Sequence, residues 1–378
     1  MKNVVIAGFA RSPFHFAKKG ALARVRPDEL AAQVIAALIE RSKIDPKEIE
    51  DVIVGCAMPE GEQGLNIGRM VAFLAHLPLN VAGATVNRFC GSSMQAIHMA
   101  AGAIQLDAGE AFVCAGVESM TRVPMTGFNP SPHPGLAKEY PQAYISMGQT
   151  AENVARKHQV TRADQQELAV KSHRKAAAAQ AAGRFKDEIV AIKAKDGVVD
   201  QDGCIRPDTS QETLSSLAPA FDADGTVTAG TSSPLTDGAA AVLVTTEEFA
   251  KRNKLPVLAR LKSIAVAGCA PEIMGIGPVP ATQKALKRAG LTMKDIDIVE
   301  INEAFASQAI VCMRELGIDE VKANLDGGGI AIGHPLGATG ARITGKAAAL
   351  LAREGKRYAL ATQCIGGGQG IATILERA

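Results

Sequence analysis

The chain has 378 residues, of which 47% are hydrophobic and 21% charged, and its formal net charge is +2 at pH 7. This length supports two or three domains with sizeable cores, and the small net charge gives no reason to expect a nucleic-acid partner. No apolar stretch approaches the roughly 18–20 residues that span a bilayer, so we expect no transmembrane segment.

Strands and helices are predicted to alternate from the N-terminus onwards. Strands are expected over residues 3–7, 51–55, 82–86 and 111–115, and helices over about 28–42, 65–75 and 91–106. Alternation of elements of this length is typical of a layered α/β fold.

The ends of the chain and its cysteines bear on where the protein resides. The first apolar run stops at Gly8, which is too short for a signal-peptide core and favours a buried strand. The C-terminal ILERA carries no peroxisomal or retention signal. Seven cysteines without a CxxC spacing argue against a disulfide framework or a structural zinc site. We therefore expect a cytoplasmic protein that binds no metal.

The character of the sequence changes between about 118 and 245. GFNPSPHPGLAKEYP (127–141) predicts a Pro/Gly-rich loop, and residues 147–185 are strongly helical with scattered basic side chains. This region reads as an inserted subdomain that covers a ligand. Solvated helix faces explain any single basic residue equally well.

The second half of the sequence repeats the plan of the first. Lys47, before the strand at 51–55, aligns with Lys294, 247 residues later, and Gly109 aligns with Gly355, 246 residues later. On this register the helix that follows Cys90 has an equivalent beginning close to Gly337. The chain is therefore expected to consist of duplicated halves.

Cys90, in VNRFCGSSMQAIHMA (86–100), lies at a predicted strand-to-helix turn. There the helix dipole favours a thiolate, and the free N–H groups of the first turn can receive an oxyanion. The alternative is a buried structural cysteine, which is the commoner fate of a free thiol.

Three further side chains in the second half lie in comparable turns. His334 is in GGGIAIGHPLGATGAR (327–342), Cys364 follows the apolar run YALAT and precedes three glycines, and Asn302 follows a strand in INEAFA (301–306). Two cysteines, a histidine and an asparagine suit acyl transfer through a thioester. One cysteine would be the nucleophile with the histidine as its base, and the other would carry protons at a pKa tuned towards neutrality.

The chain resembles the thiolase family along nearly its whole length. The resemblance rests on five ordered motifs: VNRFCGSSMQA, VTAGTSSPLTDGAAA, INEAFA, GGGIAIGHPLGATGAR and CIGGGQG. Within the family, the chain is most similar to the bacterial degradative 3-ketoacyl-CoA thiolases, the acetyl-CoA C-acyltransferases of fatty-acid β-oxidation. The resemblance implies a five-layer α-β-α-β-α fold of two βαβαβαββ halves. The halves would be 1–118, completed by about 236–257, and 258–378, with a loop domain inserted over 119–235.

The resemblance also implies roles for individual residues. Cys90 would carry the acyl group, His334 would activate it, and Cys364 would be the acid/base. Asn302 would hold a water that completes one oxyanion hole, and the N–H groups of Cys90 and Gly366 would form the other. The residues implied to touch CoA are Arg206, Phe221, Ala229, Ser233, Phe305 and Met147.

By this resemblance the expected reaction is thiolytic cleavage of 3-ketoacyl-CoA by CoA, with CoA a substrate and no cofactor. The expected assembly is a homodimer or homotetramer, and degradative relatives also partner with a hydratase/dehydrogenase subunit. A biosynthetic acetoacetyl-CoA thiolase, a condensing ketoacyl synthase and a non-catalytic acyl-CoA or lipid-binding protein stay open as alternatives. Ser146 stands where short-chain biosynthetic enzymes usually have histidine, which weakens the acetoacetyl-CoA alternative.

Overall fold

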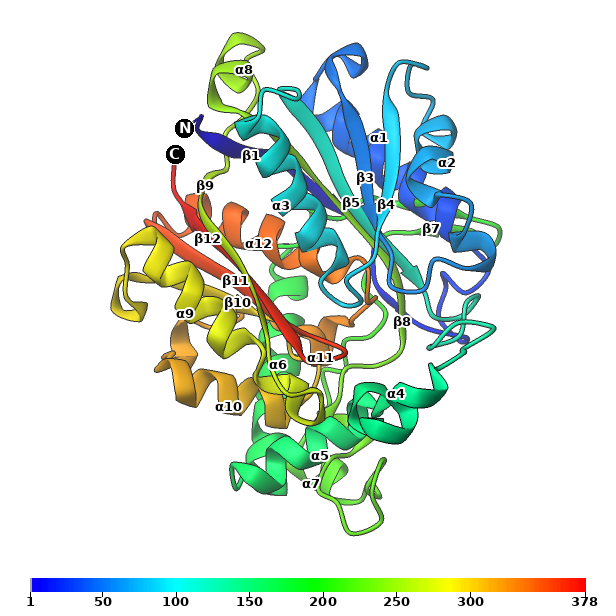
Figure 1. Ribbon diagram of the computed structural model, residues 1–378, viewed down its shortest axis with the longest axis vertical. Coiled ribbons are helices and arrows are strands. Elements are labelled where there is room, and N and C mark those ends of the chain that lie inside the picture. The colour runs from blue at the N-terminus through cyan, green and yellow to red at the C-terminus, as the bar shows by residue number, and fades with distance from the viewer. Residues whose placement is uncertain (1) are drawn as a thin grey trace.

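The buried apolar runs form one mixed ten-stranded sheet in the computed structural model, which describes residues 2–378 (Figure 1). The strands are β1 (Val4–Arg11), β2 (His15–Phe16), β3 (Asp51–Gly55), β4 (Ala82–Val86), β5 (Ala111–Ser119), β8 (Thr236–Thr246), β9 (Ala259–Gly268), β10 (Ile298–Ile301), β11 (Tyr358–Ile365) and β12 (Gln369–Glu376). Their order is β10-β11-β12-β9-β1-β8-β5-β3-β4, and β2 pairs with β8. The short strands β6 (Ile192–Ala194) and β7 (Gly197–Val199) pair separately.

Helices cover both sides of this sheet and fill the inserted region. The α-helices are α1 (Pro27–Ser42), α2 (Ile67–Leu74), α3 (Ser92–Gln105), α4 (Pro134–Glu139), α5 (Met147–Lys157), α6 (Arg162–Ala181), α7 (Gln211–Ser215), α8 (Glu247–Arg252), α9 (Pro278–Ala289), α10 (Ala306–Leu316), α11 (Gly329–Ile332) and α12 (Thr339–Arg353). Short 3-10 helices include η1 (Pro46–Glu48), η4 (Ala229–Thr231), η6 (Met293–Asp295) and η7 (Glu320–Lys322).

The strands predicted at 51–55 and 82–86 have those bounds in the structure, whereas other predictions were wrong in extent. The predicted strand at 111–115 continues to Ser119 as β5, because the whole run is buried and pairs with β8 as far as Asp237. The strongly helical stretch at 147–185 forms two helices, α5 and α6. Gln159 takes a left-handed φ of +53°, and Thr161 begins α6 with a capping box. The predicted loop at 127–141 contains α4, which starts at a proline.

Equivalent elements of the two halves recur at a constant spacing. The starts of β3 and β10, at residues 51 and 298, are 247 residues apart. The same difference separates η1 from η6, α3 from α12, and β5 from β11. In each half a parallel pair, β3 with β5 or β10 with β11, is followed by an antiparallel neighbour. The two halves meet where β1 pairs with β9.

The helices α3 and α12 lie in the middle of the molecule, between the two halves of the sheet (Figure 1). Their N-terminal turns are in close contact, since a side-chain carbon on Gly340 would lie 2.3 Å from the backbone nitrogen of Met94. The N–H of Ala341 donates to the Ser93 hydroxyl at 2.8 Å. Only glycine permits such an approach. The two equivalent helices therefore begin at one place.

Buried ion pairs connect the inserted region to both halves. Arg11 of β1, which is fully buried, contacts Glu188 at 2.8 Å and Asp202 at 2.7 Å. Lys346 of α12 contacts the same Glu188 at 2.9 Å and Asp326 at 2.7 Å. Charges are tolerated in a protein interior when they are paired in this way.

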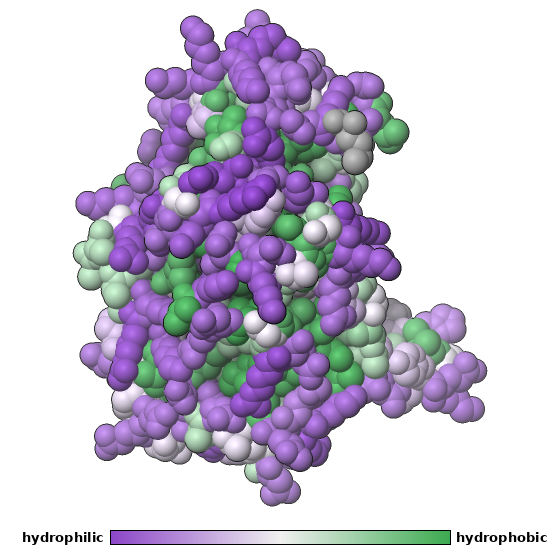
Figure 2. Space-filling model, turned by 90° about the vertical axis from the view of Figure 1, so that its left-hand side faces the viewer, coloured by the Kyte–Doolittle hydropathy of each residue, from purple (hydrophilic) through white to green (hydrophobic). Residues whose placement is uncertain are grey.

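The surface is predominantly polar. On the face shown in Figure 2, hydrophilic side chains cover most of the area, and hydrophobic ones gather in recessed parts of it. Within residues 2–378, no helix has the length and apolar character that crossing a membrane would require.

Candidate active site

Cys90 lies in the turn that joins β4 to α3, as predicted. The turn is tight, with Phe89 at a left-handed φ of +43° and the N–H of Gly91 donating to the Arg88 carbonyl at 2.9 Å. The cysteine is 8% exposed. Its sulfur receives backbone hydrogen bonds from Gly366 and from its own N–H. The two N–H groups predicted to form an oxyanion hole therefore both point at the Cys90 sulfur.

The expected preference of the helix N-terminus for a Cys90 thiolate is outweighed by burial in the resting protein. Burial raises the pKa of the Cys90 thiol to about 11, and the nearby Glu118 carboxylate acts in the same direction. The two backbone hydrogen bonds only partly oppose burial. The nucleophile therefore needs a base that removes its proton during the reaction.

His334 follows α11 in the glycine-rich turn, after Gly333 with φ +111°. Its Nδ1 lies 2.6 Å from the hydroxyl of Thr339, and that hydroxyl donates to the Pro335 carbonyl at 3.0 Å. Because the single proton of the hydroxyl is used there, the threonine oxygen accepts, and this assigns the imidazole proton to Nδ1. The Nε2 atom is then the free base. It accepts from Nδ2 of Asn302 at 3.3 Å.

The His334 imidazole is neutral at pH 7. Burial lowers its pKa to about 3, and the positive charge of Arg342 contributes in the same direction. A neutral imidazole with Nε2 unprotonated can accept a proton from a thiol in the transition state.

Cys364 was expected after a strand, but it lies inside β11, because β11 pairs with β12 through Ile365. It is buried in an apolar cluster with Met147 and Phe305. Burial and the neighbouring Cys90 raise the pKa of its thiol well above the usual value. The expectation of a pKa near neutrality was therefore wrong for the resting protein, since desolvation dominates.

Asn302 and Gly366 complete the group of predicted catalytic residues. The Asn302 N–H donates to the Thr362 carbonyl of β11 at 3.0 Å, and its side-chain Oδ1 is buried without a partner. Gly366 is covered by Phe89 and Met147, because a side-chain carbon there would lie 3.6 Å and 3.4 Å from them. The structure thus places Cys90, Cys364 and Gly366 next to one another, and it places Asn302 next to His334. Cys90 precedes α3 and His334 precedes α12, and the first turns of these two helices are in contact.

Most of the predicted CoA contacts lie beside this group. The rings of Phe221 and Phe305 meet edge to face with centroids 5.9 Å apart. Ser233 donates its hydroxyl to the Ala304 carbonyl at 3.0 Å, and Ala229 begins the nearby η4. Met147 packs with Phe305 in the Cys364 cluster.

Arg206 contacts a different set of residues. Its guanidinium lies over the Phe16 ring, 4.9 Å from the centroid. Its backbone N–H donates to Nδ1 of His173 at 3.1 Å.

Comparison with known proteins settles the family. A match to the N-terminal domain of thiolases covers residues 4–248, and a match to the C-terminal domain covers residues 255–377. The chain belongs to the thiolase family. It is 51% identical over 388 residues to a 3-ketoacyl-CoA thiolase of Shewanella loihica. It is 48% identical over 389 residues to one of Bacillus subtilis and 50% identical over 387 residues to one of Aeromonas salmonicida. All three matches cover 100% of both chains.

Several residues that shape the site of this thiolase family member were not predicted. Glu118, at the end of β5, accepts from the N–H groups of Ala57 at 2.8 Å and Gly337 at 2.9 Å, which ties the His334 loop to the N-terminal half. Gln363 donates its side-chain amide to the Cys90 carbonyl. An acidic residue in the buried run AFVCAGVES is the one sequence signal that could have revealed Glu118. Ser146, singled out above for specificity, caps α5.

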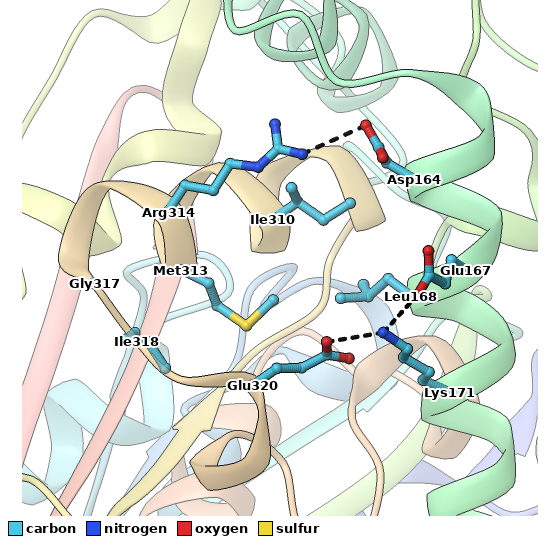
Figure 3. A pocket seen from close by; sticks show the side chains of 10 residues that line it. All are labelled: Asp164, Glu167, Leu168, Lys171, Ile310, Met313, Arg314, Gly317, Ile318 and Glu320. Atoms are coloured by element: carbon cyan, nitrogen blue, oxygen red, sulfur yellow. Dashed lines mark hydrogen bonds and ion pairs between the residues drawn. The ribbon is translucent and has the colours of Figure 1, made fainter.

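A large surface groove lies away from the site (Figure 3). Its volume is about 360 Å³, and it lies between α6 and α10 over an apolar floor that includes Leu168 and Ile310. Lys171 bridges Glu167 at 2.7 Å and Glu320 at 2.9 Å across its rim. None of the predicted catalytic or CoA residues lines it. Within residues 2–378, no cluster of side chains is suited to hold a metal ion.

The raised pKa of Cys90 predicts how the free enzyme responds to pH. Because the thiolate fraction rises about tenfold per pH unit below the pKa, alkylation of Cys90 by iodoacetamide should keep rising between about pH 6 and pH 9. Rates can be measured by mass spectrometry of the Cys90 peptide. A plateau below about pH 8 would show that the resting thiol has an ordinary or lowered pKa.

Proposed function

We propose that the protein cleaves 3-ketoacyl-CoA with CoA, which yields acetyl-CoA and an acyl-CoA shortened by two carbons. The observation that carries this proposal is that Cys90 and His334 each precede one of two equivalent helices whose first turns are in contact, and that Cys364 neighbours Cys90. Full-length identities of 48–51% to proteins named 3-ketoacyl-CoA thiolase support it.

In the first half-reaction, Nε2 of His334 takes the Cys90 proton as the sulfur attacks the 3-keto carbon. The bond between the second and third carbons then breaks. Its electron pair forms the enolate of acetyl-CoA, and the acyl group stays on Cys90. Cys364 donates its proton to the α-carbon of the enolate, so that acetyl-CoA leaves.

In the second half-reaction, free CoA enters and gives its thiol proton to the Cys364 thiolate, on the side of the site that Cys364 shares with His334. The CoA sulfur attacks the acyl carbonyl, whose oxygen becomes negative in the tetrahedral intermediate. We propose that the N–H groups of Cys90 and Gly366 stabilise this oxyanion, and that His334 with a water held by Asn302 stabilises the enolate. The intermediate collapses and releases acyl-CoA, and His334 returns its proton to the Cys90 sulfur. These steps need no metal or organic cofactor, because the thioester itself acidifies the α-carbon.

We infer that the fold is the five-layer α-β-α-β-α arrangement of two βαβαβαββ halves. The halves are 1–118 with about 236–257 and 258–378, and 119–235 forms the inserted loop domain. The constant spacing of 247 residues between equivalent elements supports this division. The family match changes from N- to C-terminal domain between residues 248 and 255.

We further infer a dimer that forms along β4 and a cytoplasmic location. The β4 strand is an edge of the sheet and its residues are only partly covered, which leaves hydrogen-bonding groups for a second copy. The free cysteines suit a reducing compartment. Pairing of dimers through the loop at 127–141 and binding of a hydratase/dehydrogenase subunit are testable by the mass of the assembly and by co-purification.

The proposal is tested by the rate of CoA-dependent cleavage of 3-ketoacyl-CoAs that range from four carbons to ten or more. We expect turnover of the longer substrates with acetyl-CoA as one product. Turnover of the four-carbon substrate alone would replace the proposal by an acetoacetyl-CoA thiolase. No turnover of any substrate would overturn it.

A further inference from the structure

Glu303 is a buried carboxylate that the proposed mechanism does not use. It follows Asn302 directly and is 4% exposed. Its Oε1 accepts from Nδ2 of Asn324 at 2.7 Å. Its Oε2 accepts from the Ser172 hydroxyl at 2.6 Å and from the Ile330 N–H at 3.3 Å. A carboxylate that organises three donors in the interior fixes the segments from which they come.

The first of these segments is the end of β10, from which Asn302 emerges. Asn324 bonds both backbone groups of Ile301, because its Oδ1 accepts from the Ile301 N–H and its Nδ2 donates to the Ile301 carbonyl, each at 2.9 Å. Glu303 orients the same Nδ2 group. The position of Asn302 therefore depends on the Glu303–Asn324 pair.

The second segment is the glycine loop that leads to His334. A side-chain carbon on Gly328 would lie 2.1 Å from the Glu303 carboxyl carbon, and one on Gly329 would lie 2.7 Å from Oδ1 of Asn302. The Gly328 N–H also donates to the Ser172 hydroxyl at 3.1 Å. The loop thus rests directly on Asn302 and Glu303.

We propose that Glu303 is a positioning residue that sets the contact between Asn302 and His334. This inference rests on the proposed function, in which those two side chains stabilise the enolate. A neutral amide cannot accept from Asn324, Ser172 and Ile330 at the same time, since it presents one donor in place of an acceptor. The strand end and the glycine loop then move relative to one another, and the 3.3 Å contact between Nδ2 of Asn302 and Nε2 of His334 lengthens.

The test is Glu303→Gln with two readouts: exchange of the α-protons of acetyl-CoA in D2O, and alkylation of Cys90 by iodoacetamide. We expect exchange to fall about tenfold and alkylation to change less than about twofold. In an Asn302→Ala background the same substitution should lower exchange by less than about twofold, because the contact it protects is already gone. A tenfold loss in both backgrounds would overturn the inference, as would equal losses in exchange and alkylation or exchange at the wild-type rate.

Glu320→Gln is the matched control. Glu320 is an ion-paired carboxylate on the groove of Figure 3, and it bonds Lys171 rather than the glycine loop. We expect it to leave exchange unchanged, and a loss as large as that of Glu303→Gln would contradict the inference. If Glu303→Gln does not fold, Ser172→Ala takes its place, with an expected loss of about threefold in the exchange rate. Exchange at the wild-type rate in Ser172→Ala would also contradict the inference. Wild-type thiolysis is measured first, so that its failure counts against the proposed function and not against Glu303.

Discussion

Cys90→Ser should lower thiolysis by about a thousandfold or more and should form no acyl adduct. A serine hydroxyl is far less acidic than a thiol, and the neutral His334 imidazole, with its pKa lowered to about 3, is a weak base. Even the thiol is hard to deprotonate, because burial raises its pKa to about 11. A serine hydroxyl at the same place would be harder still to deprotonate. The measurement is steady-state release of acetyl-CoA at saturating 3-ketoacyl-CoA.

Cys312→Ser is the control for this experiment. Cys312 is also a buried free cysteine, but it lies in α10 and its thiol bonds the Gly275 carbonyl at 3.2 Å. We expect it to keep most of the wild-type rate. Comparable rates for Cys90→Ser and the wild type would remove Cys90 from the mechanism.

Cys364→Ala should separate the two halves of the chemistry. Exchange of the α-protons of acetyl-CoA needs an acid/base at the α-carbon, and we expect it to fall by about 100- to 10,000-fold. Transfer of an acyl group from acyl-CoA to Cys90 does not need that proton, so we expect it to fall much less. The two rates are measured by deuterium incorporation and by rapid-quench mass spectrometry of Cys90.

Cys269→Ala provides the comparison. Cys269 is a less buried free cysteine, and burial raises the pKa of its thiol to about 11, but it takes part in none of the proposed steps. It should leave both rates close to those of the wild type. Equal losses of exchange and acyl transfer in Cys364→Ala would argue against a separate proton role for Cys364.

Much of the site could be predicted because local sequence patterns determine where turns occur. Cys90 stands between a β-branched run and a helical pattern, and the glycines around His334 allow the close approach that brings α12 against α3. The spacing between Lys47 and Lys294 indicated a duplication, and the equivalent elements of the structure keep the same separation of 247 residues. Turns and duplications of this kind can be predicted from the sequence, because they depend on neighbouring residues or recur at a fixed spacing.

The remainder depends on contacts between distant segments. The tautomer of His334 is set by Thr339, and the Cys90 carbonyl is held by Gln363, pairings that no spacing rule reveals. The pKa of Cys364 was misjudged because the desolvation that raises it depends on the whole tertiary structure. A helix start, such as the one that follows Cys90, can instead be recognised from the local sequence. Glu303 was not predicted, because its three partners come from α6, α11 and the loop before α11.

The central claim is that Cys90 carries the acyl group, and trapping the intermediate tests it most directly. The protein is mixed with a 3-ketoacyl-CoA of ten carbons in the absence of free CoA, quenched in acid and digested for mass spectrometry. We predict that the Cys90 peptide gains the mass of the shortened acyl group, and that added CoA removes it. An adduct on Cys364, or acetyl-CoA release with no adduct on Cys90, would contradict the mechanism.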